Sequence, residues 1–457
     1  MRLTRRVRNF GRNVAFVPDA HYRPGSVAEV LECLRRHGGA KVRCIGAGHS
    51  WSRILATDGV LLDLGALDGV AIESGSLARV GAGCTLKRLL NVLGRHGLTL
   101  PSLGAITKQT IAGAVSTGTH GSGSHSLSHF VEELRVAHAA GGEEIIVGGA
   151  GLAAARCGLG ALGVILDLAV RVVPRYRVEE RFENIERLGD VLRDKAAWPL
   201  QQFALVPWSW RYLVWRRRRT LARGSRIGAW LARLYLAVFN DVLLHWLLKH
   251  VLLRLSDARM RAFYGMLGRW MRWSPPRIDD SVRVLTLRHD LFRHVEMELF
   301  VPASRIEEAA GALREIVELA GGTRKQCSDA LRRSLAAAGL EEEVADLRGT
   351  WTQHYPLFFR RVLADDALVS MAADGERAGD DWYSISFFTY RQVEVRFARF
   401  ARTVARCILL LYRGRLHWGK YFPVTMAEAA LSYPRFDEFK RIAEAYDPAR
   451  AFWSENL

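Results

Sequence analysis

The alternation of apolar and polar residues predicts an α/β order at the start of the chain. Apolar positions recur with a helical period over residues 27–37, and short aliphatic runs bounded by glycine follow at 41–45 and 60–64. The first pattern is typical of an amphipathic helix, and the other two of strands. The turn Gly-Ala-Gly-His-Ser, residues 46–50, follows the first strand. A polar, glycine-rich turn therefore follows directly after an apolar strand.

A second helix is predicted after residue 85. Leu86, Leu89, Leu90 and Leu93 share one helical face, Thr85 is placed to cap its start, and glycine follows its end at position 97. Residues 110–128 are rich in Gly, Ser and Thr and have neither a helical nor a strand period. Strand patterns return at 131–139, 143–149 and 162–174, and we place the first domain boundary after about residue 175.

The second half of the chain mixes strand and helix patterns. Strands are predicted at 283–291, 295–302 and 382–390, and helices at Ser304–Leu319 and Val393–Tyr412. This mixture predicts an α+β domain over residues 176–412, with helices on one face of a sheet. Residues 413–457 begin with a polar motif and continue as an amphipathic helix.

Residues 210–277 form a basic and hydrophobic insertion in the second domain. The stretch 227–255 is strongly apolar, but charged and polar residues interrupt it, so it lacks a run of about 20 apolar residues and does not predict a transmembrane helix. Four consecutive arginines at 216–219 precede it, and more arginines follow. Two interpretations stay open: an interfacial helix pair facing anionic lipid, or a covered core hairpin.

Composition narrows the class of protein. The 457 residues carry a formal net charge of +18, and the region 210–280 supplies 11 charges of this excess. No basic and aromatic recognition module accompanies this charge, so we expect no nucleic-acid partner. The six cysteines show no metal-ligand or disulfide spacing, and no signal-peptide pattern follows the basic N-terminus. We therefore expect no metal and a cytoplasmic location, peripheral on the inner face of a membrane if the insertion binds lipid.

The glycine-rich segments at 46–50 and 113–123 suggest a nucleotide site. Glycine lets the backbone approach a ligand closely and present N–H groups to phosphate. Neither segment is a Rossmann fingerprint or a P-loop, because "GAGHSW" lacks the third glycine and no G-K-[ST] follows. A tight turn without a ligand therefore remains an alternative for either segment alone.

Four segments taken together resemble one family. "IGAGHSWSR", "LPSLGAITKQTIAGAVSTGTHGSG", "LGVILDLAVRVVP" and "GRLHWGKYFP" occur in the order typical of the vanillyl-alcohol oxidase superfamily, and are most similar to its L-gulonolactone, D-arabinono-1,4-lactone and alditol oxidases. The resemblance implies a PCMH-type FAD-binding domain over residues 1–175, joined by 413–457, and a substrate cap between them. It also implies a covalent bond between His49 and the 8α carbon of FAD.

The resemblance further assigns residues to the cofactor and the catalytic site. His417 and Lys420 of "HWGK" would reach the flavin and the substrate, and Arg360 would add positive charge. The residues placed around FAD are Gly46, Ala47, Gly48, His49, Ser50, Trp51, Gly104, Ala105, Thr110, Gly113, Ser116, Thr117, Gly118, Thr119, His120, Gly121, Val164 and Ile165.

Three departures from the family fall where substrate would bind. Phe358 replaces a glutamate, Phe387 stands where a histidine can stand, and Ala105 replaces a frequent serine, while Thr389 is retained. These changes remove partners for sugar hydroxyls, each of which would cost roughly 1–3 kcal/mol if buried without a hydrogen bond. The pocket formed by Phe358, Phe387 and Thr389 therefore favours a less polar substrate than a sugar.

The resulting hypothesis is an FAD-dependent enzyme that oxidises a CH–OH group of a lactone, a polyol or a less polar alcohol by hydride transfer to flavin N5. Dioxygen is the expected electron acceptor. Two alternatives stay open: a membrane-associated dehydrogenase that uses a quinone or another acceptor, and a flavin-retaining binding protein without turnover. Animal gulonolactone oxidases carry a similar hydrophobic insertion and associate with membranes, which supports the lipid interpretation of residues 210–277.

Overall fold

The computed structural model describes residues 6–454, apart from 237, 239–242, 244, 271–275, 288–292, 375–378 and 391–393. The chain forms two compact units. Unit 1 comprises Met1–Arg175, Ala364–Ala378 and His417–Leu457, and unit 2 comprises Tyr176–Leu363 and Gly379–Leu416. The chain thus returns to unit 1 at residue 417, and segment 364–378, which the sequence patterns assign to the second domain, belongs to unit 1.

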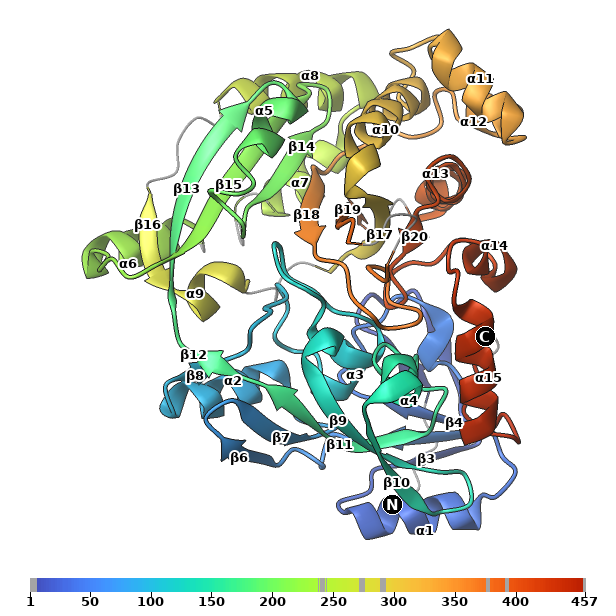
Figure 1. The fold of residues 1–457 in the computed structure, drawn as a ribbon. Coiled ribbons are helices and arrows are strands. Elements are labelled where there is room, and N and C mark those ends of the chain that lie inside the picture. Colours follow the sequence, from blue (N-terminus) through green and yellow to red (C-terminus); the bar gives the residue numbers. More distant parts are fainter. Residues whose placement is uncertain are drawn as a thin grey trace. The chain divides into compact units, whose positions relative to one another are not determined.

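Unit 1 contains two main sheets (Figure 1). The first is parallel and has the order β3-β5-β4, and helix α1 packs its buried residues Val30, Cys33 and Leu34 into the same apolar core. The second has the order β10-β9-β11-β7-β6 and is antiparallel. Their bounds are β3 Ala20–Tyr22, β4 Val42–Ile45, β5 Val60–Asp63, α1 Val27–Arg36, β6 Val70–Ser74, β7 Leu77–Gly81, β9 Val131–Ala137, β10 Glu143–Val147 and β11 Val164–Arg171.

Smaller elements complete unit 1. Two short strand pairs, β1 with β2 and β8 with β12, lie outside the main sheets. The remaining bounds are β1 Val7–Arg8, β2 Ala15–Phe16, β8 Leu98–Thr99, β12 Val173–Pro174, α2 Leu86–Arg95, α3 Ile111–Ser116, α4 Gly149–Ala155, α14 Met426–Ala430 and α15 Phe436–Tyr446. Helix α15 packs on α4, which ties the C-terminal segment to the body of the unit.

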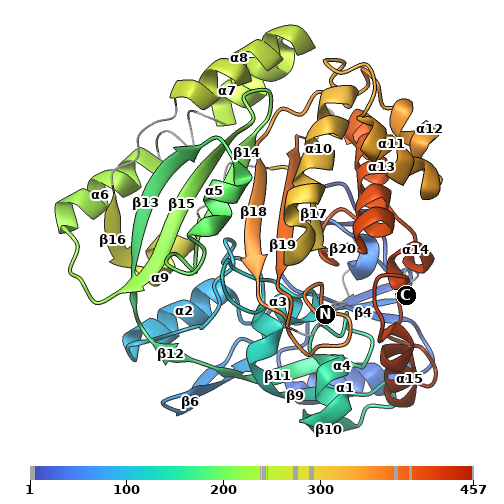
Figure 2. The same ribbon diagram turned by 45° about the horizontal axis from the view of Figure 1, so that its top comes forward.

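Unit 2 is built on one eight-stranded antiparallel sheet of order β16-β13-β15-β14-β18-β19-β17-β20. Helices α10 and α13 pack on β17 (Figure 2). The bounds are β13 Arg177–Ile185, β14 Gln202–Val206, β15 Arg211–Thr220, β16 Arg277–Asp280, β17 Val295–Pro302, β18 Leu357–Val362, β19 Trp382–Thr389, β20 Arg415–Leu416, α5 Leu188–Arg193, α9 Ser281–Leu285, α10 Ile306–Ala320, α11 Asp329–Ala337, α12 Glu341–Ala345 and α13 Glu394–Tyr412.

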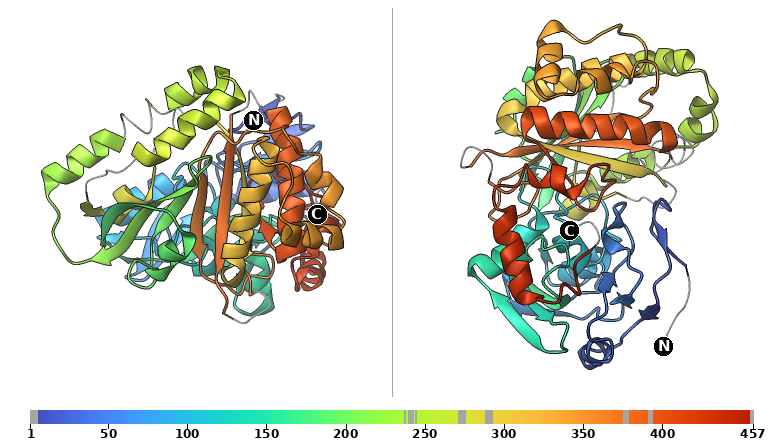
Figure 3. Two further views of the ribbon diagram at one scale, coloured as in Figure 1. Left: turned by 90° about the horizontal axis from the view of Figure 1, so that it is seen from above. Right: turned by 90° about the vertical axis from the view of Figure 1, so that its right-hand side faces the viewer.

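The hydrophobic insertion forms helices α6 (Arg226–Tyr235), α7 (His245–His250) and α8 (Asp257–Trp270). They form a layer beside the strands of unit 2 (Figure 3, left). Tyr264 of α8 packs in one apolar cluster with Leu213 of β15 and Phe388 of β19. Phe387, the neighbour of Phe388, packs instead on Phe400 of α13. Because successive strand residues point to opposite faces, the insertion and α13 cover different faces of the sheet.

The structure confirms most predicted elements and corrects two. Helix α2 begins after Thr85, whose side chain accepts a hydrogen bond from the Arg88 N–H, as predicted. Residues 281–285 form helix α9 rather than the start of a strand, because Asp280 caps it by accepting from the Val282 N–H; residues 288–291 of that prediction lie outside the described residues. The glycine-rich segment contains the short helix α3. Among the described helices, none has the length and apolarity needed to cross a bilayer.

Candidate functional site

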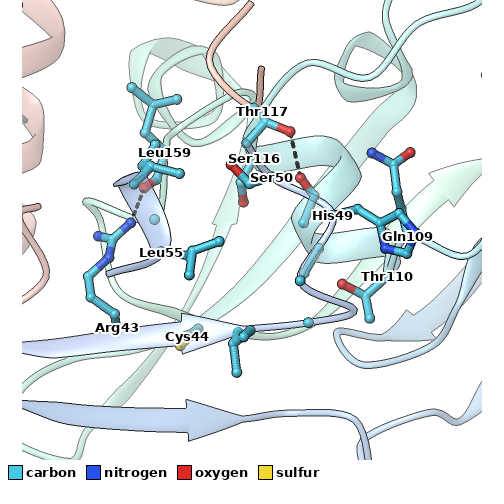
Figure 4. A pocket seen from close by; sticks show the side chains of 18 of the residues that line it. Arg43, Cys44, His49, Ser50, Leu55, Gln109, Thr110, Ser116, Thr117 and Leu159 are labelled. Atoms are coloured by element: carbon cyan, nitrogen blue, oxygen red, sulfur yellow. Dashed lines mark hydrogen bonds between the residues drawn. The ribbon is translucent and has the colours of Figure 1, made fainter. Parts of the chain in front are cut away.

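A pocket opens in unit 1 where strand β4 ends (Figure 4). Its wall consists of the turn after β4, the start of α3, a loop before β11 and the polar motif near the C-terminus. The predicted site residues that line it are Gly46, Ala47, Gly48, His49, Ser50, Trp51, Thr110, Gly113, Ser116, Thr117, Ile165, His417 and Lys420. The structure therefore brings together residues from four separate sequence motifs, up to 374 positions apart (Gly46 to Lys420).

The N-terminal segment holds the turn at residues 46–50 in place. The Phe10 N–H donates to the Gly48 carbonyl at 2.7 Å, and Nδ2 of Asn9 donates to the Ser50 carbonyl at 2.7 Å. Gly48 has a φ of +65°, a backbone conformation that residues with a Cβ rarely adopt. The turn is therefore fixed by hydrogen bonds from outside it, with its side chains left to face the pocket.

The imidazole of His49 stacks on a neighbouring ring at the pocket wall. Its centroid lies 4.8 Å from that of Phe10, with 11° between the ring planes. Nδ1 lies 3.1 Å from the Ala47 carbonyl oxygen. A carbonyl oxygen only accepts, so Nδ1 carries the proton of the neutral ring and Nε2 keeps its lone pair. The stack and this bond therefore fix the orientation of the ring.

The loops around the pocket approach one another as closely as glycine allows. A Cβ on Gly46 would lie 2.0 Å from Oγ1 of Thr110, and one on Gly113 would lie 3.1 Å from the same atom. Thr117 donates its hydroxyl to the Gly113 carbonyl at 2.9 Å. The sequence thus selects glycine where backbone and hydroxyl groups converge, a composition that suits the polar pyrophosphate of a dinucleotide.

The polar motif near the C-terminus forms another part of the pocket wall. The Trp51 N–H donates to the Gly419 carbonyl at 2.8 Å, which joins this motif to the turn that carries His49. The Gly419 N–H donates to Nδ1 of His417 at 3.0 Å, so the neutral His417 ring carries its proton on Nε2. Nζ of Lys420 lies 4.7 Å from the Trp51 ring centroid, within range of a cation–π contact.

Sequence reasoning missed several lining residues, of which Arg43 matters most. Its NH2 donates to the Leu159 carbonyl at 3.0 Å, and its NH1 donates to the Phe452 carbonyl. Burial lowers the pKa of Arg43 to about 10. A charged residue inside the aliphatic strand run "KVRCI" was the available signal. The other lining residues not predicted are Val42, Cys44, Ile45, Ile54, Leu55, Leu64, Ala82, Gln109, Ala112, Leu159, Gly160, Gly163, Gly419 and Phe452.

Other predicted residues of unit 1 do not line the pocket. His120 is buried, with Nδ1 2.9 Å from the Gly121 carbonyl oxygen and its ring 5.9 Å from that of His417. Thr119 exchanges hydrogen bonds with Gln109, which does line the pocket. The predicted residues outside the lining are Gly104, Ala105, Gly118, Thr119, His120, Gly121 and Val164. The structure gives these residues no direct contact with the cavity.

Unit 2 places Arg360 and Phe358 on one face of its sheet. Arg360 pairs with Gln202 of β14 and Ser384 of β19, so polar side chains cross the sheet in one row. The side chain of Arg360 forms neither a hydrogen bond nor an ion pair with any residue that the structure describes. Burial lowers the pKa of Arg217 on β15, two strands away, and the positive charge of Arg360 contributes to this effect. The row therefore carries positive charge.

An aromatic cluster lies beside this polar row. The Phe358 ring lies 6.0 Å from that of Trp215, 5.7 Å from that of Phe388 and 6.2 Å from that of Tyr355. Phe182 adds an edge-to-face contact with Trp215 at 5.5 Å. We call Phe182, Trp215, Tyr355, Phe358 and Phe388 the aromatic cluster. Polar and apolar surfaces thus meet on a single sheet face.

The prediction that Phe358, Phe387 and Thr389 form one pocket is wrong. The Phe387 ring contacts Phe400 of α13 edge to face at 5.9 Å, and it is fully buried there. Thr389 lies on the same side of β19 as Phe387, and its hydroxyl donates to the Tyr390 carbonyl at 3.3 Å. The strand alternation therefore puts Ser386 and Phe388, not Phe387 and Thr389, on the face of Phe358.

The pocket in unit 1 fits FAD by the chemistry of its wall. Glycine backbone and the hydroxyls of Ser50, Thr110, Ser116 and Thr117 supply polar contacts, whereas Ile45, Leu55 and Ile165 supply apolar ones. A dinucleotide with an aromatic ring system requires both kinds of contact. His49 lies within this wall, as a tether to the ring system would require.

Comparison with known proteins gives two family matches that together cover most of the chain. Residues 18–148 match a family described as FAD binding domain, and residues 168–457 match the family D-arabinono-1,4-lactone oxidase. The chain is 42% identical to a long-chain alcohol oxidase from an uncultured marine euryarchaeote, over 98% of this chain and 95% of that protein.

More distant relatives extend the comparison. The chain is 27% identical to L-gulono-1,4-lactone dehydrogenase of Mycobacterium tuberculosis, over 96% of this chain and 95% of that protein. The crystal structure of cholesterol oxidase from B. sterolicum superposes with a TM-score of 0.75 at 15% identity, over 100% of this chain and 96% of that chain. This last likeness concerns the fold alone.

Proposed function

The chain belongs to the D-arabinono-1,4-lactone oxidase family and is an FAD-dependent oxidoreductase acting on CH–OH groups, and we propose that its substrate is an alcohol with a long aliphatic chain. The observation that carries this proposal is the aromatic cluster beside the polar row of unit 2. An alcohol with an aliphatic tail gains free energy from burial against aromatic rings, whereas a sugar would lose hydrogen bonds there. The similarity to the long-chain alcohol oxidase supports the same substrate class.

We propose that His49 holds FAD through a covalent bond to the 8α carbon. The support is its place in the pocket wall and the hydrogen bond of Nδ1 to the Ala47 carbonyl, which assigns the ring proton to Nδ1 and makes Nε2 the nucleophilic nitrogen. The bond replaces one N–H of the imidazole and one C–H of the 8α methyl group. The two electrons and two protons released pass to the electron acceptor. Phe10 holds the ring in position through the stack at 4.8 Å.

Three residues are proposed to act on the substrate. Lys420 supplies positive charge near the ring of bound FAD, and the Nε2–H of His417 donates a hydrogen bond to the substrate oxygen. Arg360 supplies positive charge on the sheet face of unit 2. The oxidation removes a hydride from the carbon, and the proton of the oxygen passes to solvent water, leaving a carbonyl product. Bound FAD supplies the hydride acceptor for this step.

Dioxygen is the electron acceptor that we propose. It would take up two electrons and two protons and leave as hydrogen peroxide. A quinone or another acceptor is the second candidate, because one relative at 27% identity is named a dehydrogenase. Oxygen consumption that matches carbonyl formation mole for mole favours dioxygen. Turnover that requires an added quinone favours the second candidate.

We also propose that the protein is cytoplasmic and attaches peripherally to the inner face of a membrane. The support is the concentration of basic and exposed apolar residues in the insertion of unit 2. Positive side chains beside apolar ones favour binding to anionic lipid. Deleting residues 220–275 should move the protein from the membrane fraction to the soluble fraction after cell lysis.

Anaerobic bleaching of the bound flavin tests the substrate class. We expect hexadecanol in detergent to bleach the flavin absorbance much faster than butanol, sugar lactones or polyols at equal concentration. Lys420→Met should slow this bleaching about a hundredfold, since a missing electrostatic contact in a catalytic site costs about this factor. Lys440→Met, on helix α15 away from the pocket, is the matched control.

Two outcomes would contradict the proposal. Fastest bleaching by a sugar lactone or a polyol would assign the protein a polar substrate. A flavin that no alcohol or lactone reduces would favour a binding protein without turnover.

A further inference from the structure

Helix α6 presents its apolar side to solvent and its small residues to the protein. Ile227, Trp230, Leu231 and Leu234 follow the spacing of one helical face, and their exposed fractions are 72%, 55%, 51% and 46%. Ala229 and Ala232 on the other face are buried, and α6 packs on β16. A surface helix of a globular protein normally has the reverse orientation. The exposed face of α6 therefore requires an apolar partner.

The exposed apolar residues of the described chain concentrate in this insertion. Ten of the 17 exposed large hydrophobic residues lie between positions 221 and 266. Single exposed apolar residues are ordinary, whereas a contiguous group marks an interaction surface. Trp246 of α7 and Met266 of α8 are also exposed, with exposed fractions of 56% and 59%. The group includes two tryptophans, which prefer the boundary between water and lipid.

The charge around this surface selects an anionic partner. Arg223, Arg226, Arg254 and Arg259 are exposed, and none of them forms an ion pair within the part of the chain that the structure describes. By contrast, Asp257 in the same stretch is paired with Arg396 of α13 at 3.2 Å. Unpaired arginines beside exposed tryptophan and leucine match the headgroups and acyl chains of an anionic bilayer.

The other side of the insertion contacts the aromatic cluster. Leu252, Met260 and Tyr264 are buried in one apolar group with Phe388, and Phe358 packs against the same group. The insertion is therefore apolar on both sides: one side covers the sheet face that we assign to the alcohol chain, and the other is exposed. An element that covers the binding site of a water-soluble substrate would need an apolar surface only on its inner side.

We propose that α6, α7 and α8 dock on an anionic bilayer and take the long-chain alcohol directly from it. This inference rests on the proposed function, because it assigns a route to the substrate named there. The exposed face of α6 inserts among the acyl chains, and the free arginines bind lipid phosphates. The aliphatic tail then exchanges between the bilayer and the aromatic cluster without passing through water, where its apolar surface would be hydrated at a high cost in free energy.

The test uses the full chain and vesicles made of equal parts of phosphatidylcholine and phosphatidylglycerol. The variant Trp230→Glu/Leu231→Glu should bind these vesicles at least about tenfold more weakly, because two inserted apolar side chains become charged. Its kcat/KM for hexadecanol within the vesicles should fall by a similar factor. Its oxidation of butanol in water should match the wild type. The matched control is Val395→Glu, a residue of α13 that is 89% exposed.

A second variant tests the charge. Arg223→Gln/Arg226→Gln should weaken binding to the anionic vesicles and leave binding to pure phosphatidylcholine vesicles unchanged. Wild-type binding to the anionic vesicles should also weaken with added salt, because salt screens exposed charges.

Three results would overturn the inference. If the wild-type protein does not sediment with anionic vesicles, the proposed docking surface is ruled out, whichever substrate the enzyme uses. If the Trp230→Glu/Leu231→Glu variant oxidises hexadecanol in vesicles as fast as the wild type, the direct route from the bilayer is ruled out. A dimer in solution that this variant converts to a monomer would assign the surface to a second copy of the chain. Failure of the proposed function is distinct, because hexadecanol in detergent would then remain unoxidised while vesicle binding persists.

Discussion

At the scale of single residues, the pocket of unit 1 depends on a few positions with narrow requirements. Gly46 has room for no side chain against Thr110, and Gly48 adopts a positive φ. His49 follows directly, so its ring direction is set by the turn and by the Phe10 stack. His417 and Lys420 reach the same pocket from a motif more than 360 residues later. Small changes at these positions should therefore affect the cofactor before they affect the fold.

The variant His49→Ala tests the covalent bond to FAD. In the wild type, flavin fluorescence should stay with the chain on a denaturing gel. In His49→Ala it should disappear from the chain, because no other side chain of the turn offers a nucleophilic nitrogen at that place. His96→Ala, at the exposed end of α2, is the matched control and should keep the fluorescence. A fluorescent His49→Ala chain would assign the bond to another residue.

At the scale of elements, local signals decide where helices begin and tertiary contacts decide what they cover. The cap at Thr85 and the leucine spacing define α2 from sequence, and the structure confirms both. Helix α9 shows the opposite case, because its short aliphatic run also fits a strand and only the Asp280 cap selects the helix. In α6 the apolar stripe is visible in the sequence, but its exposure to solvent is visible only in the structure.

The cap of α2 yields a quantitative prediction. Thr85→Ala removes the acceptor for the Arg88 N–H and should lower the free energy of unfolding by about 1 kcal/mol. Thr85→Ser keeps the hydroxyl and should retain most of this stability. Chemical denaturation followed by circular dichroism measures both. Equal losses in the two variants would show that the methyl group of Thr85, rather than the cap, stabilises the helix.

At the scale of the whole molecule, the stability against acid depends on charge and on buried histidine. The chain already carries a net charge of +18, so every proton taken up at low pH adds to its self-repulsion. His354 of unit 2 is buried between the rings of Trp351 and Tyr390, and its Nε2 has no hydrogen-bond partner. Burial lowers the pKa of His354 from 6.5 to about 4.

This shift predicts a loss of stability in mild acid. Between about pH 6.5 and pH 4 the unfolded chain binds a proton at His354 that the folded chain does not bind. The free energy of unfolding therefore decreases as the pH is lowered from about 6.5 to 4, by roughly 3 kcal/mol for this group. His354→Gln should flatten the pH dependence of stability, whereas His96→Gln, at an exposed position, should leave it unchanged. An unchanged slope in His354→Gln would contradict the assignment.

The sequence by itself determined the position of the glycine turn that carries His49 and the order of the main helices and strands, and its resemblance to a known family implied the cofactor class and the two-domain α+β architecture. The turn and the elements depend on short-range requirements: a glycine where a side chain would collide, a helical cap, an apolar period. Such requirements act over a few residues and leave a readable pattern.

Only the tertiary structure decided which face each strand residue occupies and which side of the insertion is exposed. A one-residue shift along β19 moves a side chain to the other face, so Phe387 packs on α13 while Phe388 joins the aromatic cluster. Likewise, Arg43 bonds to the Phe452 carbonyl, and the segment 364–378 joins unit 1, through contacts between distant parts of the chain. Long-range packing sets these choices, because the same local pattern is compatible with either face.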